Sequence, residues 1–308
     1  MSSELKVENE FLHNCVSDTS VLFDKSIKLV KKGKVRDIYN KEEFDSIYYL
    51  SASDRLSAFD RHLTTIPFKG TVLNKITVWW FNKTNHIIPN HLLSIYNERT
   101  IKVKKCNVFP IEFVVRAYLT GTTDTSIWKN YEKGVRNYCG HHLPDNMVKN
   151  QKLHRILLTP TTKDEHDELI SKKEIIDKKI MTIKQFNQCE EYALKLFKIG
   201  QETVDKNGLI LVDTKYEFGI DENNNICLVD ELHTPDSSRY WIKKSYIERL
   251  LNKQEPDCID KEFIRKWIKN TYEDPYDLNV EIIIPNEMRL DLSSKYVQLF
   301  ELITGETF

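Results

Sequence analysis

Residues 211–241 read LVDTKYEFGIDENNNICLVDELHTPDSSRYW, and this stretch decides the fold because it describes two strands, a turn and a charged exit. By the two-residue alternation of a strand, the first strand has one apolar and one charged face. The apolar face carries Ile210, Val212, Tyr216 and Phe218, and the charged face carries Asp213, Lys215 and Glu217. A solvated hairpin face is the alternative, but it is disfavoured because a VDE triplet follows the apolar Ile-Cys-Leu run.

The turn decides which acids meet. If Glu222 to Asn225 form a four-residue loop, Asp221 pairs with Ile226 and Glu217 falls opposite Asp230. Like charges directly opposite each other are unfavourable unless a cation lies between them. Hard divalent cations bind carboxylate oxygens, so this register predicts a metal site at Glu217 and Asp230.

The composition describes a soluble globular protein. The 308 residues are 40% hydrophobic and 30% charged, with a formal net charge of −1. Such a balance gives no general attraction to nucleic acid or to an anionic membrane, so we expect neither as a partner. No apolar run approaches the ~20 residues of a membrane helix.

The cysteines and the N-terminus predict a cytoplasmic protein. The 6 cysteines are scattered without a CxxC pair, which favours neither a zinc site nor a disulfide framework. The start, MSSELKVENEFLHNC, has acidic residues where a signal peptide has a basic start and an apolar core.

The remaining pattern predicts an α+β fold in two lobes. We expect a loose N-terminal arm over residues 1–20, a β-rich lobe over 21–110, and a larger α+β lobe with C-terminal helices over 111–308. Strands are expected across the KKGK hairpin, and two more within 99–120, joined at Pro110. Helices are expected over 71–85, from about Thr125, and from Thr182 as N-cap to Gly208.

Two stretches of the first lobe favour anion binding. Gly33 in KKGKVRDIY lets backbone N–H groups approach an anion, with Lys32, Lys34 and Arg36 beside it. The alternative is a hairpin glycine among solvated lysines. SASDRLSAFDRH follows an apolar strand and suits a pocket edge, although Ser51 or Ser53 could instead cap a helix.

Two further stretches combine arginine with hydroxyls. VVRAYLTGTTDTS places Arg116 ahead of Gly121, Thr122 and Thr123, a pattern typical of a phosphate clamp. The alternative is a strand-end arginine paired with a surface acid. HTPDSSRYW offers Ser237, Ser238 and Arg239 within one loop. Together with the carboxylates, these clusters predict ATP, Mg²⁺ and a second anionic substrate.

These motifs resemble the SAICAR synthetase family, phosphoribosylaminoimidazole-succinocarboxamide synthases of purine biosynthesis, in its longer single-function form. The match rests on eight segments in order, between about Lys31 and Trp241: GKVRDIY, SASDRLSAFD, IPFKGTVLN, VVRAYLTGT, LTPTTKDEHDE, LVDTKYEFG, LVDEL and TPDSSRYW. The resemblance implies a fold distantly like those of kinases and ATP-grasp proteins.

The resemblance also implies a reaction. The family joins the carboxylate of carboxyaminoimidazole ribonucleotide (CAIR) to the amine of L-aspartate, giving SAICAR, ADP and phosphate. ATP is expected to phosphorylate the carboxylate first, although aspartate could attack first. Positioning and charge neutralisation should then supply most of the rate.

Residue roles follow from the resemblance. ATP binding is implied for Gly33, Lys34 and Arg36, and Mg²⁺ binding for Glu217 and Asp230, which with Lys215 form the catalytic group. Substrate binding is implied for Asp54, Arg116, Thr122, Lys215, Ser237, Ser238 and Arg239, with Lys163, Glu165 and Asp167 as candidate loop contacts. Two departures are a threonine where the family commonly has serine after Gly121, and a shorter loop around Lys163.

Two rival functions differ in class. A kinase-like phosphotransferase would also use a glycine turn and a carboxylate after an apolar strand, but the chain lacks HRD, DFG and GxGxxG motifs. A non-catalytic nucleotide-binding protein would bind metal without forming product.

Overall fold

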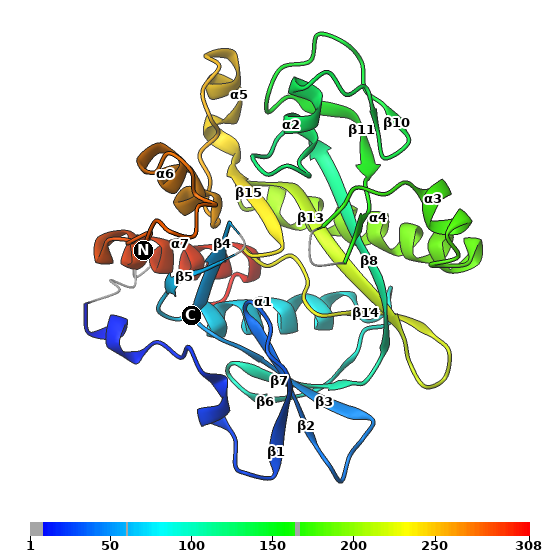
Figure 1. Cartoon of the computed structure of the whole chain (residues 1–308), viewed down its shortest axis with the longest axis vertical. Coiled ribbons are helices and arrows are strands. Elements are labelled where there is room, and N and C mark those ends of the chain that lie inside the picture. The colour runs from blue at the N-terminus through cyan, green and yellow to red at the C-terminus, as the bar shows by residue number, and fades with distance from the viewer. Residues whose placement is uncertain (1–8, 60, 164–166) are drawn as a thin grey trace.

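The computed structural model describes residues 9–59, 61–163 and 167–308, and its fold is α+β as expected. The first sheet is antiparallel, in the order β1-β2-β3-β7-β6 (Figure 1). Its strands are β1 (Ile27–Lys31), β2 (Arg36–Lys41), β3 (Ile47–Ala52), β7 (Thr100–Lys104) and β6 (Leu92–Asn97). The predicted KKGK hairpin is therefore confirmed, with Gly33 in the turn between β1 and β2.

The link from β3 to the first long helix contains a second, small hairpin. It consists of β4 (Arg55–Ala58) and β5 (Arg61–Thr65), followed by α1 (Lys69–Thr84). The alternative in which Ser51 or Ser53 caps a helix is therefore wrong. Ser51 belongs to β3, where its hydroxyl bonds with that of Thr100 at 2.9 Å across the strand pair.

The described part of the N-terminal arm packs against the first sheet. It forms two short 3₁₀ helices, η1 (Asn9–Asn14) and η2 (Thr19–Leu22). Thr19 is fully buried, and its hydroxyl donates to Asp37 at 2.6 Å. The expectation of a loose arm is wrong for this part, because a buried hydroxyl needs fixed hydrogen-bond partners.

The second sheet carries the functional hairpin. Its order is β11-β8-β13-β14, while β12 pairs with β8 and β15 with β13. The strands are β8 (Asn107–Tyr118), β11 (Lys152–Leu158), β12 (Thr161–Thr162), β13 (Leu209–Ile220), β14 (Ile226–Val229) and β15 (Ser238–Ile242). In Figure 1, β8 and β13 cross the centre of the molecule side by side, above the first sheet.

The predicted break at Pro110 is wrong, because Pro110 lies inside β8. The chain breaks earlier, between Lys104 at the end of β7 and Asn107 at the start of β8. Pro110 coincides with a register irregularity between β8 and Gly219 of β13. An irregularity of this kind tolerates the missing N–H of proline.

The helix from Thr182 is confirmed as α4 (Ile183–Asp205). Thr182 and Gln185 form a capping box, and Gly208 follows the helix with a φ of 75°. The apolar side of α4 packs on β8 and β13, with Phe186 against Phe113 at 5.4 Å between ring centroids.

The other elements of the larger lobe are short or lie toward the C-terminus. α2 (Ile127–Glu132), near the expected start at Thr125, precedes the two-residue strands β9 (Asn137–Tyr138) and β10 (His141–His142), and α3 (Lys172–Asp177) precedes α4. The tail forms α5 (Lys243–Leu251), α6 (Glu262–Thr271) and α7 (Asn286–Thr304). α7 packs against α1 and also contacts α4, so the tail is joined to the helix inserted between β3 and β6 of the first sheet and to the helix that covers the second.

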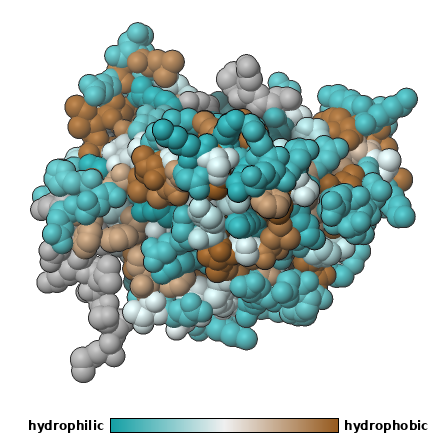
Figure 2. Space-filling view, turned by 90° about the horizontal axis from the view of Figure 1, so that it is seen from below, coloured by the Kyte–Doolittle hydropathy of each residue, from teal (hydrophilic) through white to brown (hydrophobic). Residues whose placement is uncertain are grey.

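The face seen from below in Figure 1 mixes hydrophilic and hydrophobic residues, and the hydrophobic ones form separate patches (Figure 2). Exposed Leu29, Val30, Leu93 and Ile95 belong to the first sheet. Within the described residues, no helix has the length and apolarity that crossing a membrane requires.

Candidate active site

The hairpin of β13 and β14 has the predicted alternation but not the predicted register. Tyr216 and Phe218 are fully buried in the core, while Lys215 and Glu217 form ion pairs on the other face. Ile220 pairs with Ile226, so the loop has five residues and Glu217 lies opposite Val229 rather than Asp230.

Asp221 explains the wider loop. Its Oδ1 accepts the backbone N–H groups of Asn223 and Asn225 at 3.0 and 2.9 Å. An Asx turn of this kind holds Asp221 inside the loop instead of in the ladder. The expectation of a four-residue turn is therefore wrong.

Glu217 lies at the centre of a buried charge cluster. Its side chain bonds to Lys163 and, at 3.0 Å, to Lys215, whose ammonium also lies 2.8 Å from Glu112. Burial would raise the pKa of Glu217, but Lys215 and Lys163 outweigh it and lower the pKa to about 2. The carboxylate is therefore ionised at neutral pH.

Asp230 adjoins this cluster by leaving the strand. It follows the last residue of β14 with a φ of 65°. Arg36 is its ion-pair partner at 3.6 Å, and Arg36 also pairs with Glu231 at 2.8 Å. Burial and the charge of Glu217 together raise the pKa of Asp230 to about 6. Glu217 and Asp230 thus repel each other although they are not cross-strand partners.

The two acids suit a metal that also binds a substrate. In the described part of the chain, no group of three or more His, Cys, Asp or Glu side chains is placed to hold a metal ion. Mg²⁺ is commonly bound by one or two carboxylates together with substrate phosphates. The charge of Glu217 contributes to the raised pKa of Asp230, the direction expected for two carboxylates close enough to share a cation.

The KKGK turn lines a basic cavity of about 390 Å³. Gly33 cannot carry a side chain there, because a Cβ would lie 2.1 Å from the carbonyl oxygen of Arg36. Arg55 braces the turn through the carbonyl of Gly33 at 3.1 Å and the carboxylate of Asp37 at 2.6 Å. The cavity is lined by Ser17, Lys32, Gly33, Lys34, Arg55, Ser57, Arg61 and His62.

The predicted arginine clamp is assembled across three neighbouring strands. Asp213 of β13 is paired in register with Arg116 of β8 on one side and Arg239 of β15 on the other. Its Oδ2 lies 3.5 Å from Arg116 and 2.6 Å from Arg239. The surface-acid alternative for Arg116 is therefore wrong, because its partner Asp213 is buried.

Gly121 closes the clamp from the loop after β8. Its φ is 108°, and a Cβ there would meet the Cβ of Ser126 at 2.4 Å and Arg239 at 3.4 Å. Only glycine combines this angle with so close an approach. Thr122 follows, and its hydroxyl donates to Glu262 of α6 at 2.9 Å.

The two serines of the TPDSSRYW loop are mainly engaged within the protein. Ser238 donates to the hydroxyl of Thr214 at 2.7 Å, and the Ser237 hydroxyl accepts the N–H of Thr234 at 3.2 Å. Asp236, directly before them, is held by Lys69 at 2.7 Å and by the Tyr296 hydroxyl at 2.8 Å. The loop that leads into β15 and Arg239 is thus fixed by α1 and α7.

Asp54 lies in a separate environment. It is fully buried, its Oδ1 accepts from Arg99 at 2.7 Å and from the Gly70 N–H at 2.9 Å, and its Oδ2 accepts from the Val16 N–H at 2.7 Å. These bonds join the arm, β6–β7 and α1. Direct contact of Asp54 with substrate stays a prediction.

The loop after β12 contributes Lys163, as the charge cluster shows. Asp167 is exposed on the same loop. Glu165, the remaining candidate of this loop, lies outside the described residues.

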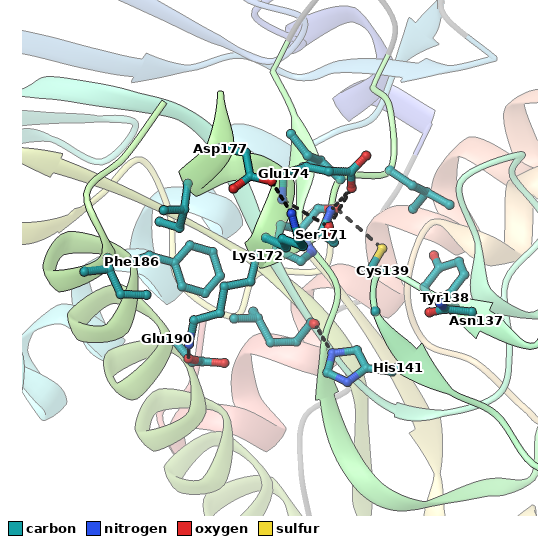
Figure 3. Close-up of a pocket in the computed structure, with 18 of the residues that line it drawn as sticks. Asn137, Tyr138, Cys139, His141, Ser171, Lys172, Glu174, Asp177, Phe186 and Glu190 are labelled. Carbon is teal, nitrogen blue, oxygen red and sulfur yellow. Dashed lines mark hydrogen bonds and ion pairs between the residues drawn. The ribbon is translucent and has the colours of Figure 1, made fainter. Parts of the chain in front are cut away.

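A larger cavity, of about 880 Å³, lies between the β9–β10 segment, α3 and α4 (Figure 3). Its polar groups are mainly paired with each other: Lys172 with Glu190 at 2.7 Å, and His141 with the carbonyl of Leu158 at 2.7 Å. Of the predicted site residues that the structure describes, none lines it. We therefore do not assign the reaction to this cavity.

Sequence reasoning missed Glu112 and Glu262. Glu112 and Arg116 are four residues apart in one apolar strand and therefore lie on the same face. This alternation could have identified Glu112 as a site residue. Glu262 lies in the tail, where no motif was matched, and only the fold brings it to Thr122 and Arg239.

The fold is that of solved SAICAR synthases. The SAICAR-synthase from Saccharomyces cerevisiae complexed with SAICAR matches with a TM-score of 0.79 and 31% identity, over 93% of this chain and 97% of that one. The phosphoribosylaminoimidazole-succinocarboxamide synthase of Legionella pneumophila (strain Paris) is 50% identical over 96% of this chain and 92% of its own length. The chloroplastic enzyme of Arabidopsis thaliana is 51% identical over 96% of this chain and 71% of its own length.

The SAICAR synthetase family profile matches residues 29–281, which extends the likeness past Trp241 into the tail. The chain belongs to the SAICAR synthetase family, a family of ATP-dependent ligases of purine biosynthesis. The kinase-like and non-catalytic alternatives are not favoured.

Proposed function

We propose that this chain joins the carboxylate of CAIR to the amine of L-aspartate and converts ATP to ADP and phosphate. The observation that carries the proposal is that the arginine clamp and the acid cluster lie on the same strand, β13. β13 presents Asp213, within the arginine clamp, and Glu217, within the acid cluster, on one face of the same strand. Two anionic substrates could therefore meet along one rigid strand.

The reaction proceeds in two steps. The CAIR carboxylate attacks the γ-phosphorus of ATP, the bond to the β-phosphate oxygen breaks, and ADP leaves. The aspartate amine then attacks the acyl carbon and gives up a proton, an amide forms, and phosphate leaves with the bonding electron pair. The protein contributes position and charge rather than covalent chemistry.

The first lobe binds ATP in this proposal. Gly33 permits the tight turn that carries Lys34, since a Cβ there would clash with the Arg36 carbonyl. Lys34 lines the cavity and Arg36 lies beside Asp230 and Glu231, and we assign the positive charge of both to the phosphates of ATP. Mg²⁺, held by Glu217 and Asp230 together with phosphate oxygens, would neutralise charge on the transferred phosphoryl group. Lys215 lies between Glu112 and Glu217, and we assign its ammonium to the reacting carboxylate.

The arginine clamp binds the phosphate of the imidazole nucleotide. Arg116 and Arg239 are fixed by one buried acid, Asp213, so both guanidinium groups are oriented before the substrate arrives. Such preorganisation lowers the cost of binding. Thr122 completes the clamp, and Ser237 and Ser238 are assigned supporting contacts.

A cytoplasmic location is also proposed, because all 6 cysteines are free thiols. Free thiols are typical of a reducing compartment.

The test measures ADP release with ATP, Mg²⁺ and CAIR, with and without L-aspartate. We expect sustained ADP release and SAICAR formation only when aspartate is present. ADP release that requires a hydroxyl acceptor and ignores aspartate would establish a phosphotransferase instead. Nucleotide binding without product would establish the non-catalytic alternative.

A further inference from the structure

Glu262, the first residue of α6, contacts the clamp from the C-terminal tail. Its Oε1 accepts the Thr122 hydroxyl at 2.9 Å, and its Oε2 lies 3.7 Å from Arg239 Nε and 3.5 Å from Arg265. Lys269 of the same helix donates to the Thr122 carbonyl at 2.7 Å. The helix is thus bound to the clamp at several points.

Glu262 is a buried anion next to groups assigned to bind an anion. Only 6% of the residue is exposed. Burial would raise its pKa, but Arg239 and Arg265 outweigh burial and lower the pKa to about 2. The carboxylate is therefore ionised across the neutral range, and it competes with any phosphate for the same positive charges.

The Thr122 hydroxyl makes this competition direct. A hydroxyl has one O–H to donate, and in this structure it donates to Glu262. It cannot donate to a phosphate until that bond breaks. Arg239 Nε is buried and, among the described residues, has no hydrogen-bond partner, because Glu262 stands beyond bonding distance. A substrate oxygen could satisfy it.

We propose that Glu262 is a positioning residue that occupies the clamp in the unliganded protein and lowers its affinity for the nucleotide phosphate. When phosphate binds, Thr122 exchanges one anionic acceptor for another, so the hydroxyl adds little net affinity. Glu262 keeps the clamp paired between turnovers and limits how tightly the product, which carries the same phosphate, is held. This inference rests on the proposed assignment of the clamp to the nucleotide phosphate.

The decisive variant is Glu262→Gln, which keeps the shape and removes the charge. Hydrogen bonds to a charged acceptor are about twice as strong as neutral ones. We therefore expect E262Q to release Thr122 more easily and to bind ribose 5-phosphate about five-fold more tightly in calorimetry. The KM for CAIR should also fall, as tighter phosphate binding requires. The kcat should fall as well, because product leaves more slowly.

Two further variants separate this role from simple packing. Glu262→Asp shortens the side chain and weakens its bond to Thr122, so it should also tighten ribose 5-phosphate binding. In the parent, Thr122→Val should weaken ribose 5-phosphate binding by less than about two-fold. In the E262Q background the same change should weaken it about five-fold, a non-additivity that packing alone does not produce. Glu191→Gln is the matched control, because it removes the same charge from an exposed pair with Lys195 on α4.

Unchanged or weaker ribose 5-phosphate binding in both E262Q and E262D, with thermal unfolding showing folded proteins, would overturn the proposal. Failure of the parent to bind ribose 5-phosphate would overturn it as well. In that case aspartate-dependent ADP release would show that the proposed reaction stands and that only the clamp assignment is wrong.

Discussion

Asp54 and Asp230 are two carboxylates that sequence reasoning assigned to one active site, and the structure places them in opposite situations. Asp54 is fully buried and accepts from Arg99 and from the N–H groups of Gly70 and Val16. Asp230 has Arg36 at 3.6 Å and repulsion from Glu217 and Glu231, and its pKa is raised to about 6. A satisfied carboxylate holds segments together, whereas an unsatisfied one is available to a ligand.

The largest expected effect comes from the acid cluster that contains Glu217 and Asp230. Glu217→Gln removes half of the acid pair that is assigned to Mg²⁺, and kcat should fall at least about 100-fold because charge stabilisation of the transferred phosphoryl group is lost. Steady-state ADP release at several Mg²⁺ concentrations measures this, and the Mg²⁺ dependence should weaken. Glu222→Gln, at the exposed tip of the same hairpin, is the control. Near-parental kinetics in E217Q would refute the metal role.

Asp54, whose carboxylate is fully paired, should show the reverse pattern: its replacement should lower stability more than it changes the kinetics. Asp54→Asn leaves Arg99 without its ion-pair partner, and removing one member of a buried pair costs about 3–5 kcal/mol of the free energy of unfolding. Denaturant unfolding measures the loss, with Asp45→Asn, in an exposed pair with Lys105, as control. If D54N kept its stability and instead raised the KM for CAIR, Asp54 would be a substrate contact and the comparison would fail.

The clamp gives an intermediate effect. Arg239→Ala removes a charge-assisted contact, so the KM for CAIR should rise about 10- to 100-fold. The KM for ATP should change much less. Arg136→Ala, whose arginine pairs with exposed Asp145, serves as control. If only the KM for ATP rose, Arg239 would have to be assigned to the ATP site instead.

The smallest effect concerns stability and has a definite sign with pH. The pKa of Asp230 is raised in the folded protein from 3.8 to about 6, so its ionisation opposes folding above pH 6 and has no effect below 3.8. Asp230→Asn should therefore stabilise the unliganded protein at pH 7.5 by on the order of 1–2 kcal/mol. Thermal unfolding of D230N and of the parent protein, measured from pH 7.5 to pH 4, should show that their difference in stability narrows. A difference that widens on acidification would contradict the assigned repulsion.

Local chemistry explains what could be predicted. The capping box at Thr182, the strand alternation of β13 and the KKGK hairpin each depend on neighbouring residues, so the sequence carries them directly. The order of eight motifs indicated the family, and the family profile confirms that assignment. The arginine clamp was predicted as separate motifs, but its organising acid, Asp213, was not recognised as the link between Arg116 and Arg239.

The strand alternation, the helix caps and the family can be read from the sequence, because each depends on residues close together or on the order of motifs. The tertiary structure alone decided the hairpin register, through the hydrogen bonds of Asp221, and the placement of Glu262 against Thr122. It also decided that Asp54 is satisfied and Asp230 is not. The physical reason is that the partners of a buried charge come from distant segments, and only packing brings them within hydrogen-bonding distance.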